Sequence, residues 1–370
     1  MKSKLIKKKA GEPVKNQIET WYLETPHKNF EWKINTSYHK PINILTLKSR
    51  GHKSFNEKAE SVAKERKNLF SENDFVVDRC PICLTTRKND LSLNVYGASY
   101  VNCSNCTHRY VMNRLSKKRL EEYYRTSNSY QATYTEKKTA RARLEDIHIP
   151  KLKWLLDEYK RFCGSKPKAI LDVGAGSGHF VACCRDSGIK CDGIELSDSG
   201  RTFAKNIFGV DLIDADFMKE WKYFIDQYDI VTFWGLIEHV ADPLEMLNTS
   251  KKILEGRTSP MIVASVPRWH SLSSTIQSIF PNKIIRHLDP LGHIQLFTDT
   301  SICVSLAKTN LQPIAFWYFG MDVYELLIQL AAETGTDKAV SSLLIETMQK
   351  TIDEATLSDS MVFAAILARK

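Results

Sequence analysis

The chain has 370 residues, 43% of them hydrophobic, which is enough for a catalytic domain and at least one smaller unit. No run of about 18 apolar residues occurs, and the lysine-rich start continues into polar sequence, so we expect a cytoplasmic protein with neither a membrane span nor a signal peptide. In such a protein the nine cysteines are expected to be reduced or metal-bound rather than paired in disulfides.

The formal net charge of +9 is concentrated at the start of the chain. The first 70 residues hold 16 Lys and Arg against 7 Asp and Glu, an excess that equals the charge of the whole chain. The remaining 300 residues are therefore balanced, which disfavours a basic catalytic face of the kind that binds nucleic acid. We interpret the first dozen residues as a solvated basic arm.

The sequence predicts four units in chain order. Residues 1–70 are a basic N-terminal extension, with short strands and turns over 18–50 and a helix over 54–70, and no function is evident in them. A zinc-binding knuckle is expected over 71–114, a helical connector over 115–165 and the catalytic domain over 166–370.

Two cysteine pairs define the knuckle. Cys80 and Cys83 form one CxxC, and Cys103 and Cys106 form a second one after 19 intervening residues. Four thiolates on two tight turns fill a tetrahedral site, which predicts a structural rather than a catalytic zinc ion. His108 is then left over. The alternative is four unrelated buried cysteines, although two CxxC turns seldom arise together by chance.

From residue 168 onward, apolar runs alternate with amphipathic segments, which is typical of βαβ units and a parallel sheet. We therefore expect an α/β fold with a seven-stranded, doubly wound, Rossmann-like sheet. The predicted strands cover 169–173, 190–195, 210–213, 228–235, 261–266, 311–319 and 361–368. Helices are expected over 321–357, before the last strand.

A glycine-rich turn follows the first of these strands. Gly174, Gly176 and Gly178 allow a sharp backbone turn and a close approach to a ligand. The dinucleotide fingerprint needs a further glycine at position 179, where the chain has histidine, and this counts against a dehydrogenase. Asp172 lies at the end of the strand, and Glu195 ends the next strand, where a carboxylate can accept hydrogen bonds from both ribose hydroxyls.

The segments DVGAGSG, IELS, DADF and YDIVTFWGLIEHVADP occur in an order and spacing that resemble class I S-adenosylmethionine (SAM)-dependent methyltransferases. The resemblance implies that the glycine loop lies under the methionine part of SAM, that Glu195 holds the ribose, and that Asp216 and Phe217 border the adenine. The full set of cofactor-binding residues that it implies is Asp172, Gly174, Ala175, Gly176, Gly178, Glu195, Leu196, Asp216, Phe217 and Trp234.

Glu238 and His239 follow the fourth predicted strand, beside the expected methyl group. Methyl transfer to a hydroxyl or an acidic carbon requires removal of a proton, and His239 is the best-placed base. Two alternatives stay open: His239 caps a helix while Glu238 bonds to backbone, or Glu238 helps to hold a divalent cation.

A long insertion after the fifth strand resembles an acceptor-covering lid, although most of its residues can also be explained by packing. Its aromatic and basic residues are Trp269, His270, Phe280, Arg286, His287 and His293.

The Glu-His pair resembles the one in ubiquinone-type O-methyltransferases and deoxysugar C-methyltransferases. The knuckle with the downstream EEYY segment resembles a bacterial methyltransferase group of deoxysugar and polysaccharide biosynthesis, although Thr107 stands where that group usually has glycine. The resemblance implies methyl transfer to a small, sugar-linked acceptor at oxygen or carbon. One alternative is an RNA or protein methyltransferase that docks through the knuckle and the basic arm. Another is a non-catalytic protein of the same fold.

Overall fold

The structure is a computed structural model that describes residues 2–8, 17–40, 75–87, 92–116, 137–280, 287–334 and 342–368, together with five isolated positions. These positions are Lys64, Arg66, Phe70, Lys118 and Arg119. Most of the helix predicted over 54–70, the EEYY segment and the start of the predicted connector lie outside the described residues, as does Arg286. No helix in the described part of the chain has the length and apolar character needed to cross a membrane.

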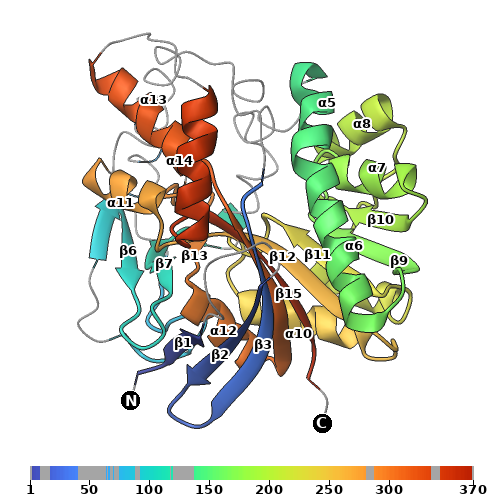
Figure 1. The fold of residues 1–370 in the computed structure, drawn as a ribbon, viewed down its shortest axis with the longest axis horizontal. Coiled ribbons are helices and arrows are strands. Elements are labelled where there is room, and N and C mark those ends of the chain that lie inside the picture. Colours follow the sequence, from blue (N-terminus) through green and yellow to red (C-terminus); the bar gives the residue numbers. More distant parts are fainter. Residues whose placement is uncertain are drawn as a thin grey trace.

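A mixed sheet of nine strands forms the centre of the molecule (Figure 1). Its order is β1-β2-β3-β14-β15-β12-β11-β9-β10. The strands are β1 (Lys4–Lys8), β2 (Gln17–Glu24), β3 (Asn29–Tyr38), β9 (Ala169–Val173), β10 (Lys190–Ile194), β11 (Ile230–Trp234), β12 (Met261–Pro267), β14 (Leu311–Phe319) and β15 (Ser360–Leu367). The central strands β9 and β12 are buried along their whole length, which explains why most of their residues are apolar.

The sequence prediction of seven strands is corrected in two ways. Residues 210–213 form no strand, because the apolar run is broken by Asp211 and pairs with its neighbour only through a bridge between Ile213 and Ile194. The N-terminal extension, in contrast, adds β1, β2 and β3 to the sheet, with β3 parallel to β14. Six of the seven expected strands are present, and three from the extension make nine.

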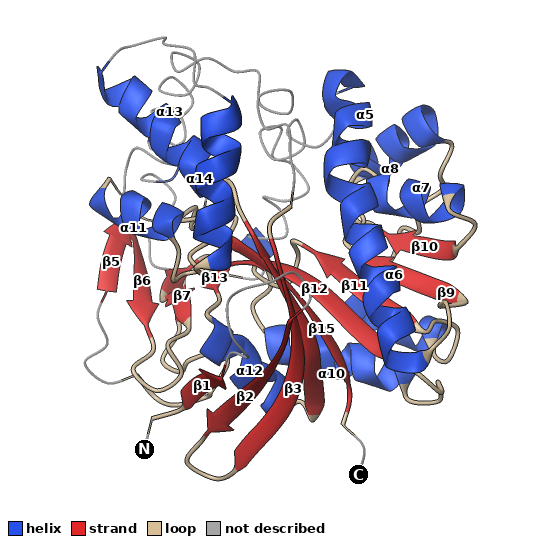
Figure 2. Cartoon of the chain, in the orientation of Figure 1, coloured by secondary structure: helices blue, strands red, loops and turns tan. Residues whose placement is uncertain are grey.

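Helices cover both faces of the sheet (Figure 2). The helices are α5 (Ala140–Arg143), α6 (Ile149–Cys163), α7 (His179–Asp186), α8 (Asp198–Phe203), α9 (Phe217–Glu220), α10 (Pro243–Leu254), α11 (Leu272–Ile279), α12 (Asp299–Lys308), α13 (Asp322–Thr334) and α14 (Ser342–Glu354). One core packs α10 and α12 against one face, and a second core packs α6 and α7 against the other. The doubly wound α/β architecture and the helices inserted before the last strand are therefore confirmed.

The direction of the strands decides where a ligand can bind. β9, β10, β11 and β12 are parallel, and β10 lies on one side of β9 while β11 lies on the other. The loops that leave the carboxyl ends of β9 and β11 therefore diverge. Ligands of open α/β sheets usually bind in the crevice between two such loops. β3 runs in the same direction as β14, so the carboxyl end of β3 lies at this same edge.

The cysteine knuckle is joined to the catalytic part by a small second sheet, ordered β13-β7-β6-β5. Its strands are β5 (Ser92–Val95), β6 (Ala98–Asn102), β7 (Arg109–Val111) and β13 (Gln295–Leu296), and a separate pair is formed by β4 (Phe75–Val76) and β8 (Asn113–Arg114). β13 belongs to the insertion after β12. The knuckle therefore shares backbone hydrogen bonds with the predicted lid.

We expect replacement of Lys7 by Met to destabilise the protein by about 2 kcal/mol, because hydrogen bonds that involve a charged group contribute about that much. The Lys7 ammonium pairs with the partly buried Asp299 carboxylate, donates to the Tyr318 hydroxyl at 3.0 Å and lies 4.2 Å from the Trp21 ring centroid. Chemical denaturation measures the loss. The control is Lys33→Met in β3, which removes an exposed lysine whose ammonium donates to the Thr20 hydroxyl. An equal loss of stability in both variants would show that Lys7 does not anchor β1.

Candidate active site

The turn after β9 is built by its glycines. Gly174, Gly176 and Gly178 have φ angles of 72°, 56° and 73°, in the left-handed region that other residues rarely adopt. A Cβ on Gly178 would lie 2.6 Å from that of Ala204, whereas one on Gly176 would meet nothing within 4 Å. The loop is therefore packed against Ala204 at Gly178 and uncovered at Gly176. An uncovered backbone of this kind can be approached closely by a ligand.

Glu195 closes the loop from the side of β10. One carboxylate oxygen accepts the Gly176 amide and the other accepts the Ser197 amide, each at 2.7 Å. Burial raises the pKa of Glu195. The next side chain, Leu196, is 42% exposed, which is unusual for a leucine beside a buried carboxylate. Each carboxylate oxygen keeps a lone pair for a further donor, such as a ribose hydroxyl.

Asp172 is 2% exposed, and its carboxylate accepts the Thr232 hydroxyl at 2.7 Å. Burial raises its pKa to about 7, although the Thr232 hydrogen bond and the Lys151 charge oppose the shift. A buried carboxylate with so few donors is suited to receive a cationic ligand.

The remaining residues of the predicted cofactor set occupy varied positions. Asp216 caps α9 by accepting the Met218 amide at 3.0 Å, which is the helix-capping role expected of such a carboxylate, and it also pairs with Lys219. Phe217 is buried in the core against Phe233. Trp234 at the end of β11 and Ala175 in the loop are partly buried. The indole nitrogen of Trp234 has no hydrogen-bond partner among the described residues.

Glu238 and His239 lie in the loop after β11, where their side chains are 4% and 10% exposed. The His239 Nδ1 donates to the Gly292 carbonyl at 2.6 Å, and its Nε2 lies 3.8 Å from Glu238 Oε1. Burial lowers the pKa of His239 to about 4 and raises that of Glu238 to about 8. The helix after this loop, α10, is capped by Asp242 instead, so His239 does not serve as its cap.

A family model described as a methyltransferase domain matches residues 148–315, which contain the glycine loop, Glu195 and the Glu238–His239 pair. The ubiquinone biosynthesis O-methyltransferase of Hydrogenovibrio crunogenus is 30% identical over 104 residues, or 26% of this chain. The chain spans 42% of the length of that curated relative.

Two solved structures are similar to part of the chain. A SAM-dependent methyltransferase from Archaeoglobus fulgidus has a TM-score of 0.40 at 19% identity, over 59% of this chain and 94% of its own. The magnesium protoporphyrin IX methyltransferase of Synechocystis PCC 6803, with bound S-adenosylhomocysteine (SAH), has a TM-score of 0.43 at 10% identity, over 68% of this chain and 100% of its own.

The matched region contains two further residues whose place in the site does not follow from the sequence. His293 of the insertion packs against His239, with ring centroids 5.1 Å apart. Lys151 of α6 lies 4.8 Å from the Trp234 ring centroid, and burial lowers its pKa to about 8 while Asp172 and Glu238 oppose the shift. The helical pattern of α6 predicts its apolar face but not which lysine enters the site, so no sequence signal distinguishes Lys151.

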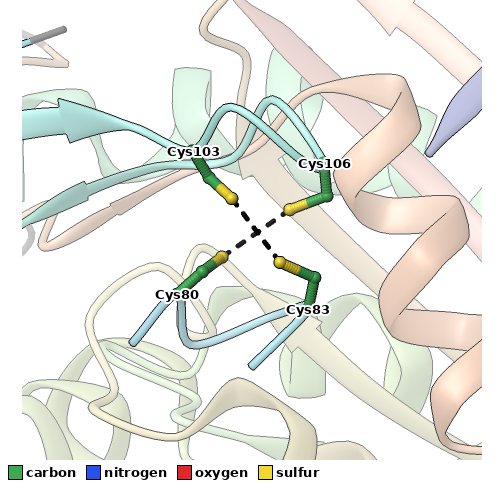
Figure 3. Close-up of side chains that lie close together, drawn as sticks. All are labelled: Cys80, Cys83, Cys103 and Cys106. Atoms are coloured by element: carbon green, nitrogen blue, oxygen red, sulfur yellow. Dashed lines mark hydrogen bonds between the residues drawn. The ribbon is translucent and has the colours of Figure 1, made fainter. Parts of the chain in front are cut away.

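The four cysteines of the knuckle converge as predicted (Figure 3). The Cys80 and Cys106 sulfurs are 3.6 Å apart, those of Cys83 and Cys103 are 3.5 Å apart, and all four lie within 4.8 Å of one another. Four ligands at about 2.3 Å from a central zinc ion would lie about 3.8 Å apart, so the arrangement suits a structural zinc site. Thr107, at the position noted above, has a φ of 62°, and its hydroxyl bonds to that of Thr298.

The knuckle also supports the loop of the histidines. The Tyr100 hydroxyl donates to the His293 carbonyl at 2.9 Å. The buried His108 bonds through Nε2 to the Gln295 side-chain oxygen at 2.7 Å. The backbone amide of Gln295 donates to the Glu238 backbone carbonyl at 3.0 Å. The position of Glu238 and His239 thus depends on residues from both units.

Proposed function

We propose that the protein is a methyltransferase that uses SAM as its methyl donor. The observation that carries the proposal is the Glu195 carboxylate, held by the Gly176 and Ser197 amides at the open end of the glycine loop. This arrangement offers acceptors to a ribose and an uncovered backbone to the methionine part of the cofactor. Asp172 supplies a negative charge for the cationic end of the cofactor.

In the proposed reaction an acceptor atom attacks the methyl carbon of SAM, the carbon–sulfur bond breaks, and its electron pair remains on the sulfur of SAH. The enzyme aligns the two reactants and assists loss of the acceptor's proton. Glu238 and His239 are the proposed catalytic residues, because they lie at the carboxyl end of β11 in a loop that the insertion holds in place.

We propose a small polar acceptor, namely a nucleotide-activated sugar or a glycan unit, methylated at oxygen or carbon. The resemblance to sugar-pathway methyltransferases supports this class, and the name of the curated relative also refers to O-methylation in a small-molecule pathway. The knuckle pairs through β7 with β13 of the same chain, which favours an internal supporting role over docking of RNA or protein. We retain 71–114, 115–165 and 166–370 as the proposed units.

Transfer of a radiolabelled methyl group from SAM to a panel of nucleotide sugars tests the function. We expect labelling of at least one acceptor by the wild-type protein and none by a Glu195→Ala variant. Labelling of RNA or protein alone would overturn the acceptor class. Failure to bind either SAM or SAH would overturn the proposal as a whole.

The raised pKa of Asp172 makes SAM binding depend on pH. A positively charged cofactor binds best to ionised Asp172, so its affinity should rise with pH through the pKa of about 7. Between about pH 6 and about pH 7 the ionised fraction of such a group increases about fivefold, and we expect the affinity to follow. Calorimetry at both pH values measures this. An Asp172→Asn variant should bind weakly and without this slope, and an unchanged slope would exclude Asp172 as its source.

A further inference from the structure

The loop after β11 and the insertion after β12 bring together three residues that can share one cation. Glu238, His239 and His293 each present a ligand atom, and these atoms lie within 4.8 Å of one another. Glu238 and His239 are buried, and His293 is partly buried. The set therefore lies inside the proposed active site and is separate from the four cysteines.

Both imidazoles are oriented as metal ligands usually are. The His239 Nδ1 lies 2.6 Å from the Gly292 carbonyl, and the His293 Nδ1 lies 3.2 Å from the His287 carbonyl. Because a carbonyl only accepts, each Nδ1 carries the proton in the neutral ring, and Nε2 carries the lone pair. Metal-bound histidines typically donate their other ring nitrogen in this way, which fixes the orientation of the ring.

Glu238 supplies the carboxylate of the set. It is 3% exposed, and its Oε2 is buried without a hydrogen-bond partner among the described residues. Burial of an ionised carboxylate in this way is unfavourable unless a cation or a donor compensates it.

We propose that Glu238, His239 and His293 bind one divalent metal ion of the kind that accepts mixed nitrogen and oxygen ligands, such as Mn²⁺, Co²⁺ or Zn²⁺. The inference rests on the proposed function, since it gives this ion a place in methyl transfer. Three protein ligands leave coordination positions open. An acceptor hydroxyl in one of these positions would lose its proton to water more easily. Its oxygen would then form the bond to the methyl carbon as the carbon–sulfur bond breaks. His239 would act as a ligand and not as the base.

Mn²⁺ is the appropriate probe, because it prefers oxygen and nitrogen ligands and competes poorly for a thiolate site filled with zinc. We expect electron paramagnetic resonance of the zinc-loaded protein to show one bound Mn²⁺ per chain. Glu238→Gln and His293→Ala should each weaken that binding by about tenfold or more, as loss of a ligand or its support commonly does. His27→Ala, which removes an exposed histidine between β2 and β3, should leave it unchanged.

Titration with SAH shows whether each variant is folded and separates this inference from the proposed function. Bound Mn²⁺ that depends on Glu238 and His293 supports the metal site even in a protein that transfers no methyl group. If the wild-type protein binds SAH and methylates an acceptor but binds no Mn²⁺ at millimolar concentration, the metal site is wrong and the proposed function stands. Equal Mn²⁺ affinity of wild type and both variants would also overturn it.

Discussion

Glu195→Ala is expected to reduce the affinity for SAM and SAH by about 100-fold, or about 3 kcal/mol, because two charge-assisted hydrogen bonds to the cofactor would be lost. The variant also leaves the Gly176 and Ser197 amides without their acceptor, so the open end of the glycine loop loses its support. Isothermal titration calorimetry with SAH measures the effect without any need to know the methyl acceptor.

Asp198→Ala is the matched control for Glu195. Asp198 lies three residues further along the chain, its side chain is 94% exposed, and its contact is an ion pair with Arg201 on the surface. Surface ion pairs contribute little, so the affinity of this variant should stay near that of the wild type. Equal binding by wild type and Glu195→Ala would mean that the cofactor, if it binds, is held elsewhere.

Loss of the zinc ion is expected to have the largest effect on stability. Structural zinc sites supply about 10 kcal/mol or more of folding free energy in small units, and the cysteines belong to a core that also contains Trp21 and Phe297. Cys106→Ser should therefore lower the zinc content well below one per chain and lower the melting temperature. Methyl transfer should fall as well, because Tyr100 and His108 support the segment that contains His293 and Gln295.

Cys163→Ser provides the control for thiol chemistry. Cys163 is partly buried at the end of α6 and belongs to no cluster of metal ligands among the described residues. Its replacement should change neither the zinc content nor the melting temperature by more than a small amount. Atomic absorption and thermal unfolding give both readings. A wild-type protein that contains no zinc and resists chelators would show that the four cysteines have another role.

Much of the doubly wound sheet was predictable because its central strands are buried on both faces. The runs that became β9, β11 and β12 are mostly apolar, so their type and order follow from the sequence. The place of β3 in the sheet does not follow. It alternates buried and exposed residues over part of its length, like any strand with one covered face, and its partner β14 lies far away in the sequence.

The candidate site was likewise predictable only in part. The positions of Asp172 and Glu195 follow from the strand ends that carry them, since parallel strands meet at one edge. His293 was predicted only as part of a lid, because a two-residue strand, β13, places its loop against the knuckle. Pairing of so short a strand depends on tertiary contacts and leaves no periodic pattern in the sequence.

The most direct test of the account is a crystal structure of the protein grown with SAH. We expect the ribose hydroxyls on the Glu195 carboxylate and the amino acid part of SAH over the loop from Gly174 to Gly178, on the side of Asp172. SAH bound at another edge of the sheet, or side chains filling the space beside Gly176, would contradict the central claim.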